Sequence, residues 1–316
     1  MSPAPAPTFL VGSVRSGTTL LRLMLDHHPR IAFFSEMEFI VNPLPASGGF
    51  ITVGQFRDYG KADYFFRESG FEIRDGVQCY EEMARDFMEQ FRRRRGKPLV
   101  GATVHENFDR LLRIWPDAKF IHLVRDPRDV ARSIARMGGW AGTPWGSAQL
   151  WIDAETLWDR VQPALPAGRK IEVTYERLVA EPEVTLTQLA AFFGLPYDPA
   201  MLSYPNDTTY DPPTLSLVNQ WKAKTSERDV QLVEARVGGL LAARGYPPSG
   251  LPPLTISPAL EARLRREDKS AKRRFRRNRY GLALWTADLL TRRLRLKRLH
   301  RKVRRRLDEV DRKYIK

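Results

Sequence analysis

A polar turn near the N-terminus is the stretch best suited to bind an anion. Residues 9–12 are apolar and end at Gly12, which predicts a short buried strand, and from Thr18 onward apolar residues recur at helical spacing. The first amides of a helix have no partner inside it, so the amides of Ser16 to Thr19 are expected to hold an anion. The residues gathered at this helix start are Arg15, Ser16, Gly17, Thr18 and Thr19.

The turn departs from the Walker A pattern at its most diagnostic position. Gly12 and Gly17 have the Walker spacing, but Thr18-Thr19 follows where that motif has Lys-Ser or Lys-Thr. The lysine that contacts the β- and γ-phosphates is therefore missing, and Arg15 precedes the second glycine instead. A plain strand-turn-helix without a ligand is the alternative. The crowding of hydroxyls and a guanidinium at one helix start favours the anion site.

Two residues are candidates for a general base. Residues 31–34 read as a second strand, and Glu36 follows it; His105 follows a further short strand at 99–101. In an open α/β sheet, the loops at the carboxyl ends of the strands line the ligand crevice, which places both side chains near the anion turn. The alternatives are that Glu36 caps the next helix and that His105 is structural.

A second anion-binding pattern lies in the middle of the chain. Residues 120–124 predict a buried strand that ends at Arg125, and Pro127 begins a helix on which Ser133 lies eight residues after Arg125. Arg125 and Ser133 are therefore expected to bind one phosphate from two sides. The alternative is that Arg125 pairs with Asp126 or Asp129.

Charge divides the chain into two predicted domains. The net charge is +15, but 23 of the 52 basic and only 7 of the 37 acidic residues lie in residues 256–316, which therefore carry +16, while residues 1–255 carry −1. We expect an α/β domain over 1–255 and a basic helical C-terminal extension over 256–316. The single cysteine, Cys79, excludes an internal disulfide.

The basic extension suggests partners other than the substrate. Its apolar segment, from Tyr280 to Leu290, is flanked by arginines, a pattern that suits a helix on an anionic membrane surface or on a polyanion; a solvated helical arm is the alternative. No module that reads nucleic acid accompanies the charge, so no specific nucleic-acid partner is expected. The N-terminus lacks the pattern of a signal peptide, which predicts a cytoplasmic protein with peripheral membrane association.

The two anion-binding patterns together resemble the sulfotransferases that use 3′-phosphoadenylyl sulfate (PAPS). Arg15 to Thr19 is similar to that family's 5′-phosphosulfate loop, and Arg125 with Ser133 is similar to its 3′-phosphate motif. The resemblance covers about residues 8–240. It implies a P-loop-like three-layer domain with a central parallel sheet flanked by helices, PAPS as co-substrate, sulfuryl transfer to a hydroxyl or amine, no metal, and an approach of Tyr175 to the nucleotide.

Two branches of the family bear on the base and the acceptor. In the tyrosylprotein branch the glutamate at the position of Glu36 is the catalytic base, but Glu38 stands where that branch has a substrate-contacting arginine. His105 lies near the catalytic histidine of the small-molecule branch, so the base stays open between Glu36 and His105. Bacterial sulfotransferases look closer over residues 99–133.

The acceptor class is open among saccharide, lipid, small molecule and peptide. Residues 42–80, rich in glycine and proline, are expected to be a loop-rich insertion that covers the acceptor. The rival functions are an ATP-dependent phosphotransferase of the P-loop type and a non-catalytic adaptor that acts through the basic tail on a membrane or a polyanion.

Overall fold

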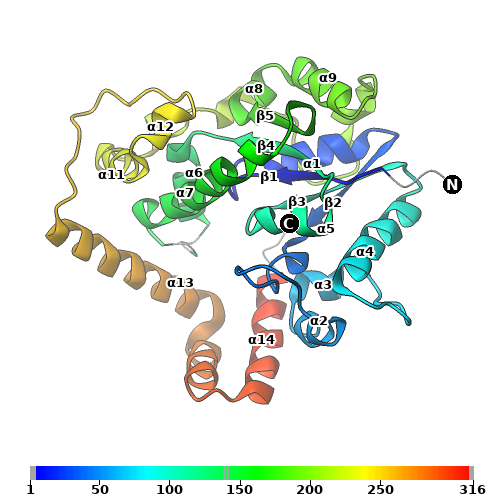
Figure 1. Cartoon of the computed structure of the whole chain (residues 1–316). Coiled ribbons are helices and arrows are strands. Elements are labelled where there is room, and N and C mark those ends of the chain that lie inside the picture. Colours follow the sequence, from blue (N-terminus) through cyan, green and yellow to red (C-terminus); the bar gives the residue numbers. More distant parts are fainter. Residues whose placement is uncertain (1–4, 138–139, 141, 313–316) are drawn as a thin grey trace. The chain divides into compact units, whose positions relative to one another are not determined.

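Five parallel strands form the central sheet of the protein (Figure 1), in the order β2-β3-β1-β4-β5. Four of them, β1 to β4, are short and mainly apolar, as expected for strands that helices cover on both faces, whereas the edge strand β5 is more polar and less buried. Their bounds are β1 Thr8–Val11, β2 Ile31–Glu36, β3 Leu99–Val104, β4 Lys119–Val124 and β5 Lys170–Thr174. The predicted α/β class with a parallel sheet flanked by helices is confirmed.

This computed structural model describes residues 5–137, 140 and 142–312. Two compact units are present: the first contains the chain up to Asp129 together with residues 150–223, and the second contains residues 130–149 and the chain from residue 224 onward. The domain boundary predicted after residue 255 stays a prediction.

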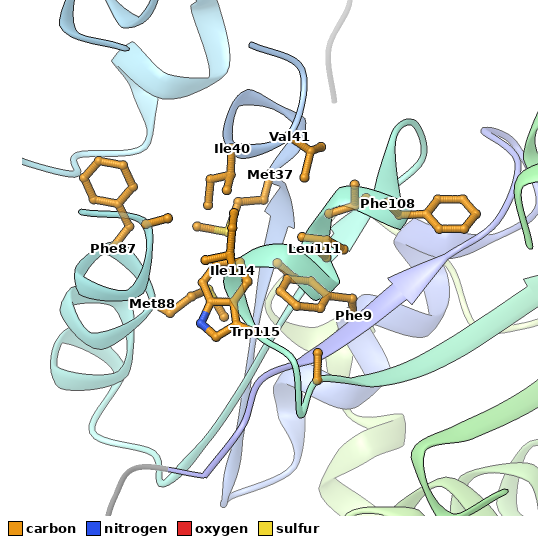
Figure 2. Close-up of a cluster of buried hydrophobic side chains, with 14 of the residues drawn as sticks. Phe9, Met37, Ile40, Val41, Phe87, Met88, Phe108, Leu111, Ile114 and Trp115 are labelled. Carbon is orange, nitrogen blue, oxygen red and sulfur yellow. The ribbon is translucent and has the colours of Figure 1, made fainter. Parts of the chain in front are cut away.

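Alternate residues of β1 face two separate cores of the first unit. Phe9 and Val11 belong to one hydrophobic cluster and Leu10 to the other, because successive side chains of a strand point to opposite faces. Figure 2 shows part of the first cluster, where Phe9 lies against Trp115 at a ring distance of 5.2 Å. The helices that supply this face include α4 (Tyr80–Arg95) and α5 (Leu111–Ile114). The opposite face is covered by α1 (Thr18–His27), α8 (Tyr175–Ala180) and α9 (Pro182–Phe192).

Residues 42–80 contain two helices that the sequence prediction did not include. They are α2 (Val53–Gly60) and α3 (Tyr64–Glu68). A capping box explains the start of α2, because Thr52 accepts from the amide of Gln55 and the Gln55 side chain accepts from the amide of Thr52. The expected loop-rich structure of residues 42–80 is therefore found only outside these two helices.

The second unit is helical in its described part. Two helices, α6 (Pro127–Arg136) and α7 (Pro144–Val161), run across the boundary between the units. The unit continues through α10 (Trp221–Lys224, which begins in the first unit), α11 (Glu227–Val237) and α12 (Leu240–Ala243). It ends with α13 (Pro258–Arg293) and α14 (Lys297–Arg312), which confirms the predicted basic helical extension. None of the helices in the described part of the chain is long and apolar enough to cross a membrane.

The strand order brings three distant turns to one end of the sheet. β1 lies between β3 and β4, in parallel register with both. The turns after these three strands begin at Gly12, His105 and Arg125, so they meet at the carboxyl ends of neighbouring strands. Ligands of open α/β sheets bind at such a position, where successive connections leave in opposite directions.

Truncating Phe9 tests the packing beneath this end of the sheet. Its ring is fully buried between Trp115 and Phe120. We expect Phe9→Ala to lower the free energy of unfolding by about 3–5 kcal/mol, because it removes a buried ring and leaves a cavity. Urea unfolding measures the change, with Phe65→Ala, at a side chain 38% exposed, as control. Equal losses in both variants would contradict this packing.

Candidate anion-binding site

Neighbouring atoms leave no room for a side chain at either glycine of the turn between β1 and α1. A Cβ at Gly12 would lie 2.2 Å from the carbonyl oxygen of Leu123, and one at Gly17 would lie 2.3 Å from the Tyr175 ring. Both residues also have positive φ, at +146° and +96°. Arg15 has φ of 69°, a left-handed conformation that is uncommon for a residue with a side chain and clusters at functional sites.

The N-terminus of α1 has polar groups without protein partners. Gly17 occupies the N-cap position and no side chain caps the helix. The Ser16 hydroxyl is buried and has no partner among the described residues, whereas the Ser16 amide donates to Ser13 at 3.2 Å. The amides at the start of α1 and the Ser16 hydroxyl are therefore the groups that point to an anion, and the Ser16 amide is used inside the turn.

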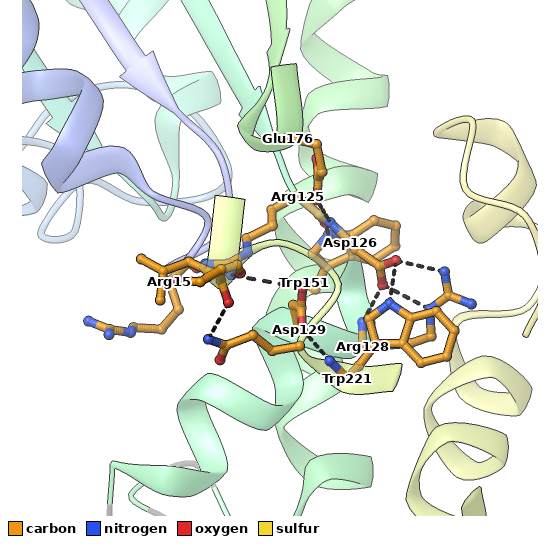
Figure 3. A network of polar contacts seen from close by, with 11 residues as sticks. Arg15, Arg125, Asp126, Arg128, Asp129, Trp151, Glu176 and Trp221 are labelled. Carbon is orange, nitrogen blue, oxygen red and sulfur yellow. Dashed lines mark hydrogen bonds and ion pairs between the residues drawn. The ribbon is translucent and has the colours of Figure 1, made fainter. Parts of the chain in front are cut away.

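Arg125 lies beside this turn and is held mainly by carbonyl oxygens. Its guanidinium donates to the carbonyls of Leu217 at 2.6 Å and Arg15 at 3.4 Å, and its buried Nε has no partner among the described residues. Figure 3 shows Arg125 and Arg15 together. Desolvation lowers the pKa of Arg15, and the charge of Arg125 lowers it further. Two cations that approach each other in this way favour a bound anion.

A separate ion pair neutralises the aspartate next to Arg125 (Figure 3). Arg128 donates to both carboxylate oxygens of Asp126, the shorter contact being 2.6 Å, and stacks 3.8 Å above the ring of Trp221. The Trp221 indole also donates to Asp126, at 3.1 Å. Arg125 therefore does not pair with Asp126, and its nearest approach to Asp129 is 3.9 Å. The Asp126 half of the expected alternative is wrong, whereas the Asp129 half is confirmed as a long ion pair at 3.9 Å.

Tyr175 links the two parts of the site. Its ring contacts Gly17 on one side, and the Arg125 guanidinium lies 4.0 Å from the ring centroid. Tyr175 is 3% exposed, and burial raises the pKa of its hydroxyl, which therefore stays protonated at neutral pH. The structure thus places Tyr175 beside the predicted anion turn.

Ser133 lies on α6, beyond the point at which this helix enters the second unit. The site described here is built from the first unit alone. A contribution of Ser133 to phosphate binding stays a prediction.

His105 and Glu38 connect the ends of β1 and β3. The Nδ1 of His105 lies 2.9 Å from the carbonyl oxygen of Gly12, so this nitrogen carries the hydrogen and donates it. The backbone amide of His105 donates to Glu38 Oε1 at 2.8 Å. His105, which is 8% exposed, therefore holds the anion turn in place through its hydrogen bond to the Gly12 carbonyl.

Glu36 lies at the end of β2 and, unlike Glu38, has no hydrogen bond to His105. Its half-buried carboxylate makes no hydrogen bond or ion pair with any residue that the structure describes. It is close enough to Arg22 and Glu38 to influence the pKa of both. The role of Glu36 as a base therefore stays a prediction.

Glu38 is a residue that the sequence reasoning undervalued. Burial raises the pKa of Glu38 to about 7, and the charge of Glu36 acts in the same direction, while His105 opposes both. Its Oε2 is buried and has no partner among the described residues. The available signal was its position two residues after Glu36, in the turn that leaves the sheet, but its burial depends on the distant His105.

Metal ligands do not gather within the described residues. No group of three His, Cys, Asp or Glu side chains in that part of the chain is arranged to hold a metal ion.

Comparison with known proteins shows the family to which this chain belongs. The model of the sulfotransferase family matches residues 7–199, more than half of the chain, including both anion-binding patterns. The chain belongs to the sulfotransferase family. The predicted resemblance to PAPS-dependent sulfotransferases is thereby confirmed, as is the prediction of an enzyme, and the reaction class is sulfuryl transfer.

Individual relatives agree with the family. Protein-tyrosine sulfotransferase 1 of Danio rerio is 28% identical over 277 residues, which cover 78% of this chain and 74% of the relative. Among solved structures, the sulfotransferase domain from the curacin biosynthetic pathway aligns with a TM-score of 0.53 at 19% identity, over 78% of this chain and 99% of that one. The sulfotransferase domain of the Synechococcus PCC 7002 olefin synthase aligns with a TM-score of 0.52 at 22% identity, over 74% and 96%. These structures share the fold of the sulfotransferase described here.

The environment of Glu38 predicts a pH dependence of stability. Its pKa in the folded protein is about 7, above the ordinary value of 4.5, so the folded state binds more protons than the unfolded state between these values. The contribution of Glu38 to the free energy of unfolding is therefore fully present at low pH and is lost as pH rises from about 4.5 through 7. We expect Glu38→Gln, which cannot ionise, to show a smaller fall in Tm between pH 5 and pH 8. Glu72→Gln, at an exposed side chain, is the control, and an unchanged slope in Glu38→Gln would contradict the assignment.

Proposed function

We propose that this sulfotransferase transfers the sulfuryl group of PAPS to a hydroxyl or amine. The 5′-phosphosulfate would bind at the start of α1, to the amides of Gly17 to Thr19, the Ser16 hydroxyl and Arg15. The 3′-phosphate would bind to Arg125, with Ser133 as a further ligand and Tyr175 against the nucleotide. The observation that carries the proposal is the uncapped helix start with the buried, unpartnered Ser16 hydroxyl beside Arg125.

The chemistry follows from where charge develops. The acceptor oxygen or nitrogen attacks sulfur, and the bond between sulfur and the bridging oxygen breaks, so that 3′,5′-ADP leaves with the electron pair. Negative charge grows on the phosphate oxygens at the helix start. Preorganised amides and the guanidinium of Arg15 stabilise it without reorganisation.

Glu36 is the base that we propose for this step. Its carboxylate lies at the end of β2, without a hydrogen bond or ion pair to the described residues, and can take the acceptor's proton. His105 uses Nδ1 and its amide to hold Gly12 and Glu38, which makes it a positioning residue for the turn.

The acceptor faces an acidic neighbourhood. Glu36 and Glu38 are close enough to interact electrostatically, and Glu38 is engaged with His105. Two carboxyl groups disfavour a negatively charged acceptor, so we propose a neutral or cationic one. The name of the Danio rerio relative points to protein tyrosine for that protein; here a screen with labelled PAPS against saccharide, lipid, small-molecule and peptide acceptors identifies the class.

Nucleotide binding tests the two arginines. We expect 3′,5′-ADP to raise the Tm of the wild-type protein and ATP-Mg²⁺ to have little effect. Arg125→Ala should abolish most of this shift, and Arg15→Ala should lower kcat at least a hundredfold, about the loss seen when one oxyanion donor is removed. Arg30→Ala, at an exposed arginine just before β2, is the matched control. Stabilisation by ATP-Mg²⁺ alone would favour the phosphotransferase instead.

Single isosteric changes distinguish the two candidate bases. Glu36→Gln should lower kcat by about 10²–10⁴-fold with an unchanged 3′,5′-ADP shift, because only proton removal is lost. His105→Asn should instead leave both kcat and the 3′,5′-ADP shift close to those of the wild type, because the Asn amide nitrogen can donate to the Gly12 carbonyl in place of Nδ1. Full activity in Glu36→Gln, together with a kcat loss in His105→Asn at unchanged nucleotide binding, would assign the base to His105.

A further inference from the structure

The end of the C-terminal helical pair exposes an unusual set of leucines. Gly281, with φ of 74° and ψ of 163°, divides α13, so that residues 282–293 form a separate helix that is followed by a turn and by α14. Six leucines between the start of this helix and the first turn of α14 are between 45% and 62% exposed. We call these residues the leucine tip: Leu282, Leu289, Leu290, Leu294, Leu296 and Leu299.

Two polar side chains of the same segment, Asp288 and Thr291, lie inward. Asp288 and Thr291 are buried, the hydroxyl of Thr291 lies 3.2 Å from Nδ1 of His300, and the same nitrogen lies 3.8 Å from Asp288. A helix pair in water is expected to bury leucines and to expose such polar groups. At these positions the arrangement is reversed, although Val303 and Leu307 of α14 are buried as expected, and an exposed apolar patch of this kind marks an interaction site.

The charges around the leucine tip indicate what covers it. Arg292, Arg293, Arg295 and Arg298 are exposed among or beside the leucines. The single carboxylate in residues 281–300 is Asp288, which is 8% exposed and pairs with Arg292 at 2.7 Å. The accessible surface of this end therefore combines apolar side chains with positive charge and has no accessible carboxylate.

We propose that the leucine tip inserts into the headgroup region of an anionic lipid membrane. Leucines that enter the acyl boundary, ringed by arginines that meet anionic headgroups, are the two components of interfacial binding. A nucleic acid would use the arginines and leave the leucines in water. Because no described helix is long and apolar enough to cross a membrane, the contact is peripheral. It is independent of the proposed co-substrate and acceptor.

Sedimentation with vesicles tests the proposal on the full chain. Vesicles of phosphatidylcholine with 30% phosphatidylglycerol are compared with vesicles of phosphatidylcholine alone. We expect binding to the anionic vesicles only, weakened by salt. The triple variant Leu289→Gln/Leu290→Gln/Leu294→Gln should lose at least tenfold in vesicle affinity and keep the thermal shift with 3′,5′-ADP, which shows that it is folded.

Two further variants separate the contributions. Phe65→Gln/Met137→Gln/Val184→Gln removes three exposed apolar side chains elsewhere and should bind vesicles as the wild type does. Arg293→Gln/Arg298→Gln should lose affinity for anionic vesicles and lose most of the salt dependence.

Three outcomes would overturn the proposal. The first is a wild-type protein that does not bind anionic vesicles. The second is a triple leucine variant that binds anionic vesicles as tightly as the wild type does, together with an oligonucleotide that competes with the vesicles for the wild-type protein. That result would assign the surface to a polyanion. The third is a wild-type dimer that the leucine variant converts to a monomer without any change in vesicle binding, which assigns the surface to a second copy of the chain.

Discussion

The turn after β1 depends on the absence of a side chain at Gly12, because the backbone of Gly12 lies against the backbone of the neighbouring strand β4. The carbonyl oxygen of Leu123 occupies the space that a Cβ would need, and the carbonyl of Gly12 accepts a hydrogen bond from His105. β4 and the end of β3 thereby define the position of the turn. The α1 amides and the Ser16 hydroxyl are presented at one point because of this contact, before any ligand is bound.

The two sides of this turn carry groups of opposite charge: a guanidinium on the side of β4 and carboxyl groups on the side of β2. On the side of β4, Asp126 is satisfied by Arg128 and Trp221, so the positive charge of Arg125 is not cancelled by its neighbour in the sequence. On the side of β2, Glu36 and Glu38 supply carboxyl groups, and burial raises the pKa of Glu38 to about 7, so that Glu38 is only partly ionised near neutral pH. The proposed assignment of an anion site and a base to these two sides matches what sulfuryl transfer requires. Two ionised carboxylates next to a bound anion would weaken its binding, and the raised pKa of Glu38 limits this repulsion.

Buried charge also occurs away from the site, where it serves packing. His122 in β4 is fully buried, and it contacts Glu172 at 2.8 Å and Glu155 at 3.3 Å and stacks on Trp158. Burial lowers the pKa of His122, and the two carboxylates outweigh this effect and raise it. Neither glutamate is near His122 in the sequence. Composition identified the strand as core and had no means of showing that the core contains a charged group.

The sequence alone was sufficient for features that depend on neighbouring residues. Apolar runs predicted the strands around Phe9 and Phe120, and the Gly12–Gly17 spacing predicted a turn that presents helix amides. Arg125 was correctly placed at a strand end. The tertiary structure decided the features that depend on residues far apart: the stacking of Tyr175 on Arg125, the pairing of Asp126 with Arg128 and Trp221, and the burial of Glu38 against His105. The physical reason is that local sequence determines backbone conformation and period, whereas desolvation and pairing of a charge depend on which strands and loops the sheet order places side by side.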